Sequence, residues 1–462
     1  MADASGGESA DGHLAGSVST RLLPIGIVVY ALLFLGFYPT FYASQDERIY
    51  LAKAFSLSQG ELFHSAPPPG EMWIDKYPPG QALLLTAAMQ IGDWAIALVN
   101  PLALVLATLI LAAILRKRAV PEYFALLLLF HPAMFLFART IMADVTSAFA
   151  FLLAFWLLLE ERRAWLWGAL ALGFTVSLRV AMLLFAVFGL VWVIWREREA
   201  TVLWKIGLGF ALGAAPFLYY LRQSQLMSGY AHDVDSISAA NIAPHAALYF
   251  ASLNIIFPAM FLIGMIQRYR GELFPKLTAA LALMFFPMFT RHPGEGLELV
   301  VLVQRYFLFV IGPLLIGYSL FLKERVLVDT RRFLALGALL LAAGVALSAA
   351  HQDVLNRNAA FHKTIYEHTT SGSLLITDDR TVELIQDAAG RRLALNTELM
   401  KTVEDVARRI DAAGSRDVFL IYMRREPGEQ WPLGDAILER YEWTSVVNRT
   451  DKWDLQLFHL AR

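Results

Sequence analysis

The segment from Asp46 to Gly80 reads DERIYLAKAFSLSQGELFHSAPPPGEMWIDKYPPG, and it separates the first apolar stretch of the chain from all later ones. It opens on the acidic pair Asp46 and Glu47, and near its end Asp75 and Lys76 precede a Tyr-Pro-Pro-Gly turn. Polar loops held on a rigid scaffold often carry the function of a protein. We therefore predict that the chain is organised around this loop and that the apolar segments on either side support it.

The composition outside this loop is that of a membrane protein. Of the 462 residues, 57% are hydrophobic and 17% are charged, whereas a soluble chain carries about a quarter charged residues. The apolar residues form runs of roughly 16 to 22 residues, which is the length of a membrane-spanning helix. Strands of a β-barrel would alternate between apolar and polar residues instead. The sequence therefore predicts an all-α polytopic membrane protein.

Charge and cysteine content exclude several classes of function. The net charge is −1, so no overall basic field favours nucleic acid as a partner. The chain has no cysteine, which excludes disulfides, thiol chemistry and metal sites with cysteine ligands. Residues 1–20 are small and polar and are predicted to form a disordered cytoplasmic tail.

Eleven apolar segments are predicted to cross the membrane. The first is too long for the apolar part of a cleaved signal peptide, so we interpret it as a retained anchor. The apolar piece Gln81–Gly92 has about twelve residues, too few for a span, and is predicted to be a re-entrant or interfacial helix. The predicted spans are 22–42, 94–115, 120–138, 144–160, 164–178, 180–195, 202–221, 248–266, 276–290, 305–322 and 333–350.

Lys and Arg residues in the loops indicate the orientation, because they favour the cytoplasmic side. With the N-terminus inside and Gln81–Gly92 not crossing, most basic loop residues fall on the inner side, including Arg116–Arg118. The C-terminal part then lies outside, and we expect a multi-pass protein of the inner (plasma) membrane. The outer side receives a smaller basic set: Arg48, Lys53, Lys76, Arg139, Arg179, Arg222, Arg291 and Arg305.

The part from His351 to Arg462 changes character, since it is charged and its apolar runs are short. Two runs, Leu374–Thr377 and Val418–Tyr422, are predicted strands, and the alternating run Trp453–Leu460 is a third. Thr397–Ala413 is a predicted helix. This pattern indicates a small α/β domain of about 110 residues, in which we find no nucleotide-binding motif.

The polar loop contains two candidate groups. Asp46 and Glu47 follow the first span directly, where a helix N-terminus would favour their negative charge. The alternative is a simple helix cap. Lys76 lies beside a rigid Pro-Pro turn and could serve as a fixed cation for a phosphate. The alternative is an interfacial lysine that reaches the lipid headgroups.

Further candidates lie at the outer ends of other spans. Arg139 and Asp144 occupy one tight hairpin at membrane depth, where charges are costly and commonly functional. A structural ion pair between these two residues is the alternative. Arg179 interrupts an apolar stretch, and Arg305 with Tyr306 begins the tenth span. His292 is a candidate base, although an isolated loop histidine is more often simply solvated.

These residues suggest a chemistry when they are taken together. The predicted topology gathers the carboxylates and the cations on one side of the bilayer. A carboxylate can take a proton from an acceptor, and cations can balance the charge that develops on a leaving phosphate. This combination favours the transfer of a group from a phosphate-linked donor.

Three motifs resemble a known family. They are DE-xx-Y-xxx-A after the first span, Lys-x-Pro-Pro at residues 76–79 and AR-xxxx-D at residues 138–144. Together they resemble bacterial GT-C glycosyltransferases of the lipid A aminoarabinose and galacturonic acid transferase and protein O-mannosyltransferase type. The likeness in motifs covers about residues 22–200. From 200 to 350 it rests on the architecture and on Arg305-Tyr306.

The resemblance implies an inverting glycosyltransferase that uses a polyprenyl-phosphate sugar on the outer face of the membrane. Its acceptor would be a lipid, a glycan or a protein of the cell envelope. The implied domains are a GT-C-like transmembrane domain at 21–350, with a catalytic outer loop at 43–93, and an extracytoplasmic α/β domain at 351–462. The protein would also contact membrane lipid.

The resemblance also implies roles for the candidate residues. Tyr77 stands between Lys76 and Pro78, whereas many relatives have lysine directly before the two prolines. Some members of the wider superfamily bind a divalent metal near these carboxylates. A metal therefore stays open here, although the sequence has no histidine cluster to hold one. The implied catalytic residues are Asp46, Glu47 and Asp144; the donor phosphate would be bound by Lys76, Arg139, Arg179 and Arg305, with Asp75, Tyr77, Tyr306 and His292 in support.

Two other functions remain as alternatives. A transporter or flippase of lipid or sugar would be expected to show inverted repeats and helices broken by Gly or Pro near the membrane midplane. A non-catalytic membrane scaffold would not need Asp46, Lys76 and Asp144 together.

Overall fold

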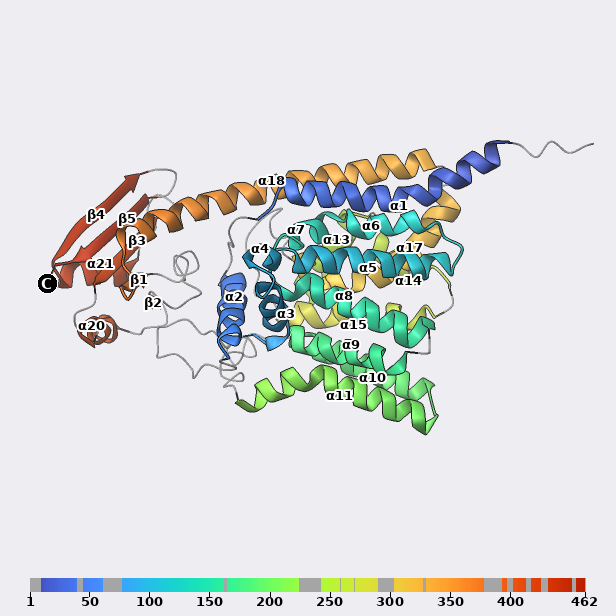
Figure 1. The fold of residues 1–462 in the computed structure, drawn as a ribbon, viewed down its shortest axis with the longest axis horizontal. Helices are drawn as coiled ribbons and strands as arrows, with labels where there is room; N and C mark the ends of the chain where they lie inside the picture. Colours follow the sequence, from blue (N-terminus) through green and yellow to red (C-terminus); the bar gives the residue numbers. More distant parts are fainter. Residues whose placement is uncertain are drawn as a thin grey trace, which may run out of the picture. The chain divides into compact units, whose positions relative to one another are not determined.

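A computed structural model shows the fold (Figure 1). Clustering of contacts divides the chain into two compact units. The first unit is Met1–Tyr38, Ala97–Phe217 and Ala231–Ala350, and the second is Pro39–Ile96, Leu218–Tyr230 and His351–Arg462. The structure describes residues 10–39, 45–60, 77–161, 164–223, 242–257, 259–269, 271–289, 303–326, 330–377, 393–396, 402–412, 417–424, 431–450 and 454–461. Three predicted site residues, Asp75, Lys76 and His292, lie outside these ranges.

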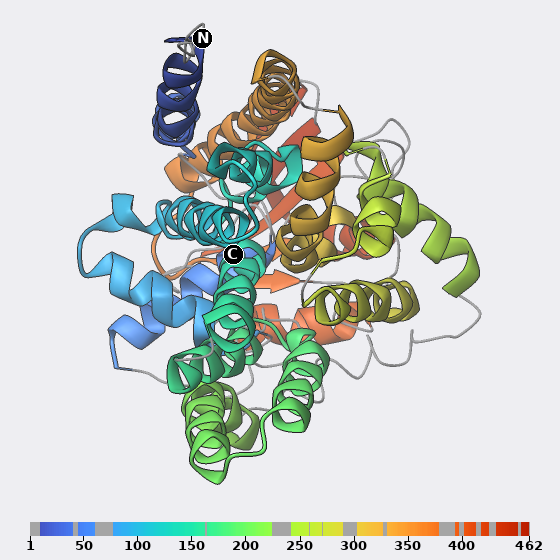
Figure 2. The same ribbon diagram turned by 90° about the vertical axis from the view of Figure 1, so that its right-hand side faces the viewer.

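The first unit is a bundle of helices. Many of them run in nearly the same direction (Figure 1), so that Figure 2 shows several of them end-on. Two helices continue into the second unit, namely α11 (Ala200–Gln223) and α18 (Thr330–His368). The others are α1 (Ala10–Gly36), α5 (Val99–Arg116), α6 (Leu126–Leu129), α7 (Pro132–Phe137), α8 (Ala143–Phe155), α9 (Trp165–Leu178), α10 (Met182–Arg196), α13 (Ile242–Ile255), α14 (Met260–Ile266), α15 (Leu273–Phe289) and α17 (Leu308–Phe321), with the short segments η2 (Glu122–Ala125), η3 (Trp156–Glu161), η5 (Arg305–Phe307) and η6 (Leu322–Val326).

Exposed apolar side chains mark surfaces of the bundle that suit lipid. On α5, Leu102, Leu106 and Leu109 are 58%, 46% and 43% exposed, while Leu104 and Leu111 on the opposite side are buried. The spacing of the exposed leucines places them on one side of the helix. On α10, Leu183, Val187, Val191 and Ile194 form a similar exposed stripe. Such apolar stripes are unfavourable in water, so the bundle is that of a polytopic membrane protein.

The helix lengths agree with this conclusion. Among the residues that the structure describes, five helical segments are long and apolar enough to cross a membrane, and the bent pair α13–α14 makes a sixth if it is one span. Four further apolar helices are shorter, with 10–17 residues. The five long segments are Val99–Arg116, Ala143–Glu161, Ala200–Arg222, Arg305–Val326 and Thr330–His368.

The predicted span 120–138 differs from a continuous helix. It consists of η2, α6 and α7, with a break at His131 and Pro132. Pro132 has no amide hydrogen to donate, and it forces the residue before it out of the helical conformation. His131 accordingly has an extended backbone, with φ −60° and ψ 118°. The predicted span is therefore divided by proline into short helical pieces.

Close backbone contact joins α9 to α11. A Cβ atom at Gly213 would lie 2.1 Å from the Leu170 oxygen, and one at Gly209 would lie 2.2 Å from the Leu166 oxygen. Gly209 and Gly213 are four residues apart, so they lie on the same face of α11. Small residues at this spacing let membrane helices approach closely.

Short helices of the second unit lie within the segment 43–93, which was predicted to be the catalytic outer loop. The first is α2 (Gln45–Ser58), and the second is α3 (Pro79–Met89), which is followed by α4 (Asp93–Ile96). The hydroxyl of Thr86 on α3 donates to the Ala54 oxygen of α2 at 3.0 Å. At 11 residues, α3 is about 16 Å long, well short of a membrane core of about 30 Å. It matches the short helix predicted at Gln81–Gly92.

The C-terminal part of the second unit is a five-stranded sheet with the order β2-β1-β3-β5-β4. The strand β1 is parallel to β2 and β3, and β5 is antiparallel to β3 and β4. The predicted strands at 374–377, 418–422 and 453–460 are confirmed, whereas β2 and β4 were not predicted. The strands are β1 (Leu374–Thr377), β2 (Leu393–Asn396), β3 (Val418–Arg424), β4 (Trp443–Thr450) and β5 (Asp454–Leu460).

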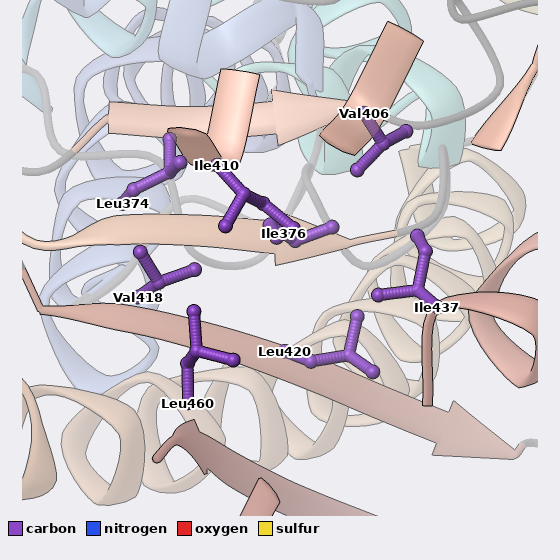
Figure 3. Packing of buried hydrophobic residues seen from close by; sticks show 8 residues of the cluster. All are labelled: Leu374, Ile376, Val406, Ile410, Val418, Leu420, Ile437 and Leu460. Atoms are coloured by element: carbon purple, nitrogen blue, oxygen red, sulfur yellow. The ribbon is translucent and has the colours of Figure 1, made fainter. Parts of the chain in front are cut away.

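Helices cover both faces of this sheet. Successive side chains of a strand point to opposite faces, and both sets are buried here. Residues Leu374, Ile376, Val418, Leu420 and Leu460 pack against α20 (Val403–Ala412) and α21 (Pro432–Arg440), as Figure 3 shows. The strand residues that point to the opposite face of the sheet pack against Phe361 and Ile365 of α18. The predicted small C-terminal α/β domain is therefore confirmed.

Candidate functional site

Asp144 lies at the start of α8. Met142 before the helix is extended, and the helix begins at Ala143, which places Asp144 in the first turn. The carboxylate is buried, with 4% of the side chain exposed. The N-terminal end of a helix stabilises negative charge, so this position suits a buried carboxylate.

Arg179 forms an ion pair with Asp144. The helix α9 ends at Leu178, and Arg179 is extended. Its Nη1 lies 2.7 Å from Oδ1 of Asp144, and its side chain is 13% exposed. Both side chains are largely buried, and a buried ion pair is screened much less by salt than an exposed one. Two of the predicted site residues are thus brought together.

Arg305 and Tyr306 join this pair. The Nη1 of Arg179 also approaches the backbone oxygen of Arg305, at 3.4 Å. The ring centroid of Tyr306 lies 5.8 Å from the guanidinium carbon of Arg179 and 5.3 Å from that of Arg305. We call Asp144, Arg179, Arg305 and Tyr306 the arginine cluster. It gathers two cations, one carboxylate and one phenol within the first unit.

One guanidinium of the cluster retains donors. Among the residues that the structure describes, Nη1 is the only nitrogen of Arg179 in an ion pair or a hydrogen bond. The group carries five donors in a planar fork, which matches the oxygens of a carboxylate or a phosphate. Asp144 pairs with one arm of this fork, and Nε and Nη2 have no hydrogen-bond partner among the described residues.

Asn100 holds the turn that leads to Asp144. Its Nδ2 donates to the backbone oxygens of Thr140 and Met142, at 2.6 and 2.8 Å. Asn100 is the second residue of α5, and its side chain is buried. The sequence analysis missed this residue. The available signal was an amide side chain at the start of an apolar segment, where an unpaired polar group is expensive.

Arg139 contacts two helices of the first unit. Its Nε donates to the Phe37 oxygen just beyond α1 at 3.0 Å, and its Nη1 donates to the Ser348 oxygen of α18 at 2.7 Å. The side chain is buried. The contact with Phe37 places a cation at the C-terminal end of α1, and it is favourable because that end of a helix carries partial negative charge. The phosphate-binding role predicted for Arg139 stays a prediction.

A second group lies on α2, within the second unit. The Tyr77 hydroxyl donates to Oδ1 of Asp46. The ring of Tyr50 stacks on that of Tyr77, with centroids 4.9 Å apart and planes at 22°. The Nζ of Lys53 donates to the Tyr77 oxygen at 2.8 Å. Glu47 is buried on the same helix.

The predicted site residues therefore fall into two described groups. The arginine cluster and Arg139 belong to the first unit, and Asp46, Glu47 and Tyr77 belong to the second. That all of them share one site stays a prediction.

The described residues do not provide a metal site. Within the ranges that the structure describes, no group of three or more His, Asp or Glu side chains is placed to hold a metal ion. Asp144 is engaged with Arg179.

Comparison with known proteins gives the fold. A scan of protein-family models finds no match to the sequence, and a search of curated proteins finds none. Among solved structures, however, a crystal structure of ArnT from Cupriavidus metallidurans in the apo state covers 96% of this chain and 98% of its own, with a TM-score of 0.66. This chain has the fold of ArnT. The sequence identity to ArnT is 14%, so the likeness establishes the fold alone.

Two further structures agree. ArnT bound to undecaprenyl phosphate matches with a TM-score of 0.60 and 13% identity, over 98% of both chains. The apo oligosaccharyltransferase of Archaeoglobus fulgidus matches with a TM-score of 0.50 and 11% identity, over 87% of this chain and 69% of its own. The GT-C fold predicted from the motifs is confirmed.

Proposed function

We propose that the protein is an inverting glycosyltransferase that takes a sugar from a polyprenyl-phosphate donor. Its acceptor is a lipid, a glycan or a protein of the cell envelope, and the reaction takes place on the outer face of the inner membrane. The observation that carries the proposal is the arginine cluster, with donors available on Arg179, inside a fold shared along nearly its whole length with ArnT. One ArnT structure is bound to undecaprenyl phosphate.

The arginine cluster serves the donor phosphate. The planar fork of Arg179 can bind two phosphate oxygens, and Arg305 adds a second positive charge beside Tyr306. These charges stabilise the negative charge that develops on the leaving phosphate. Asp144 orients Arg179 through the ion pair between its Oδ1 and Nη1 of Arg179, which are 2.7 Å apart. Lys76 and Arg139 remain further proposed ligands of the phosphate.

Asp46 acts as the general base. The acceptor oxygen attacks the anomeric carbon of the sugar, and its proton passes to Asp46. The bond between that carbon and the phosphate oxygen breaks, and its electron pair leaves with polyprenyl phosphate. We assign this role to Asp46 rather than to Asp144, because Asp144 is occupied in orienting Arg179. Glu47, Asp75 and His292 are proposed to support the reaction.

Product formation tests the proposal. Purified protein in lipid is incubated with labelled polyprenyl-phosphate sugars and an envelope extract, and the labelled product is identified by mass spectrometry. The proposal expects a glycosylated envelope component and released polyprenyl phosphate. If no sugar leaves any of the polyprenyl-phosphate donors, the proposal is wrong.

The role of Arg179 gives a second test. Arg179→Met should weaken binding of undecaprenyl phosphate by about tenfold or more, the usual effect of losing a charge-assisted hydrogen bond. Arg179→Lys should be intermediate, because an ammonium cannot reproduce the two-pronged contact. Arg325→Met, at an exposed position on η6, is the matched control. Equal binding by wild type and Arg179→Met would remove Arg179 from the phosphate site.

A transporter of lipid or sugar is the second candidate. The break at His131-Pro132 and the 88° bend between α13 and α14 are the kind of helix interruption found in transporters. The rings of His131 and Phe257, which stand at these two interruptions, are 5.3 Å apart. Movement of labelled polyprenyl-phosphate sugar across a vesicle membrane, without loss of the sugar, would favour this function over transfer.

A further inference from the structure

One face of α2 holds Tyr77. Asp46, Tyr50 and Lys53 are separated by four and three residues, so they lie on the same side of the helix. Each binds a different part of Tyr77: Asp46 accepts from the hydroxyl, Tyr50 stacks on the ring and Lys53 donates to the backbone oxygen. Together these contacts fix the position and the direction of the side chain.

The chain on the other side of Tyr77 is also constrained. Pro78 and Pro79 follow directly, and Pro79 begins α3. Proline fixes the backbone angle φ, which restricts the turn. The bond from Thr86 to the Ala54 oxygen then ties α3 to α2. Lys53 itself is buried, with its Nζ 4.0 Å from the ring centroid of Tyr220.

We infer that Tyr77 is a positioning residue for the Asp46 carboxylate. Its hydroxyl holds Oδ1, and this bond fixes the plane of the carboxylate and the direction of Oδ2. Oδ2 is then the oxygen that takes the proton from the acceptor hydroxyl. The inference rests on the proposed function, which makes Asp46 the base. It also explains why tyrosine stands between Lys76 and the two prolines in this chain.

The substitution Tyr77→Phe isolates the hydroxyl. It removes the bond to Asp46 and keeps the ring that stacks on Tyr50 and the backbone oxygen that binds Lys53. We expect kcat to fall by about tenfold, since the lost bond is to a charged group, while KM for the donor stays the same. A purely structural role would instead reduce the amount of folded protein.

The pH dependence provides a readout specific to positioning. A hydroxyl that donates to a carboxylate stabilises the ionised form of that carboxylate. In Tyr77→Phe, the fall of kcat on the acidic side of its pH profile should therefore occur at higher pH than in wild type. The other charged groups on α2 near Asp46 are Glu47, Arg48 and Lys53, whereas α3 has no titratable side chain. From the end of α11, Tyr220 contacts Lys53. Tyr77→Phe leaves all of these groups unchanged.

Infrared spectroscopy separates this inference from the proposed function. The C=O stretch of protonated Asp46 is assigned by its loss in Asp46→Asn and is followed from neutral to acid pH. In Tyr77→Phe the C=O band of protonated Asp46 should appear at higher pH than in wild type. The control Tyr441→Phe, in the C-terminal domain, should leave the pH at which this band appears unchanged. This shift without any transferase activity would support the contact and refute the proposed function. Transferase activity with the same titration and the same kcat in Tyr77→Phe would overturn the inference.

Discussion

Asp144 illustrates what single residues in this sequence could reveal. Its position at membrane depth identified it as a functional candidate, and the structure pairs it with Arg179. Arg139, its nearer neighbour in the sequence, instead reaches backbone oxygens of Phe37 and Ser348. Charge at a helix end can be read from the sequence, but the choice of partner depends on how the helices pack.

Asn100 was not predicted because its two bonds go to backbone oxygens. Backbone acceptors occur at every residue, so no sequence pattern marks them. The amide matters nonetheless, since it fixes the turn from which Asp144 enters α8. The sequence marks Asn100 as a polar residue in an apolar segment, but only the fold shows which backbone oxygens it binds.

We predict that Asn100→Asp is strongly destabilising. The substitution keeps the shape but places an acceptor against the oxygens of Thr140 and Met142, which costs several kcal/mol in a buried site. The melting temperature of the purified protein and its transferase activity should both fall. Thr108→Val on the same helix is the control, because Thr108 bonds only within α5, to the Leu104 oxygen. Equal melting temperatures for Asn100→Asp and Thr108→Val would contradict this role.

At the scale of elements, the long apolar runs indicated a membrane protein, two short apolar runs predicted β1 and β3, and one alternating run predicted β5. The strands β1 and β2 both have four residues, but β1 reads Leu-Leu-Ile-Thr, with a β-branched isoleucine, whereas β2 reads Leu-Ala-Leu-Asn and carries no residue that favours strands. The strand β4 lies at the edge of the sheet, and its residues 444–446 are exposed. Because this part of the strand has no buried face, its sequence does not alternate between apolar and polar residues. The break at Pro132 was visible in the sequence, but the surrounding apolar run concealed it.

The crossing of α9 and α11 gives a prediction at this scale. Gly213→Ala should lower the melting temperature, because its Cβ would lie 2.1 Å from the Leu170 oxygen and force the helices apart, at a cost of about 1–3 kcal/mol. Gly207→Ala on the same helix meets nothing within 4 Å and should be neutral or slightly stabilising. The two variants are compared by thermal unfolding in the same detergent. Similar behaviour would show that the close approach does not matter for stability.

For the whole molecule, the fold and the orientation rest on different arguments. The fold is that of ArnT over nearly the entire length. The orientation is a prediction that places the N-terminus in the cytoplasm and the C-terminal domain outside, and it rests on the distribution of Lys and Arg. The predicted division into a tail at 1–20, a transmembrane domain at 21–350 and an outer domain at 351–462 likewise rests on the sequence.

Cysteine labelling tests the orientation, and the chain has no native cysteine to interfere. Ser445→Cys lies on an exposed position of β4, and Ala200→Cys lies on an exposed position at the start of α11. A membrane-impermeant maleimide should label Ser445→Cys in intact cells. Ala200→Cys should react only after the cells are opened. The reverse pattern would place the C-terminal domain in the cytoplasm and refute the proposed outer site.

The central claim is that Asp46 drives sugar transfer from a polyprenyl-phosphate donor, and a single-turnover measurement tests it most directly. Purified wild type and Asp46→Asn are saturated with labelled polyprenyl-phosphate sugar, acceptor is added, and product is followed in time. We predict rapid transfer by wild type, with Asp46→Asn slower by about two to four orders of magnitude, the usual contribution of a general base, although it binds the donor equally well. Near-equal rates for the two proteins, or no transfer by wild type, would contradict the account.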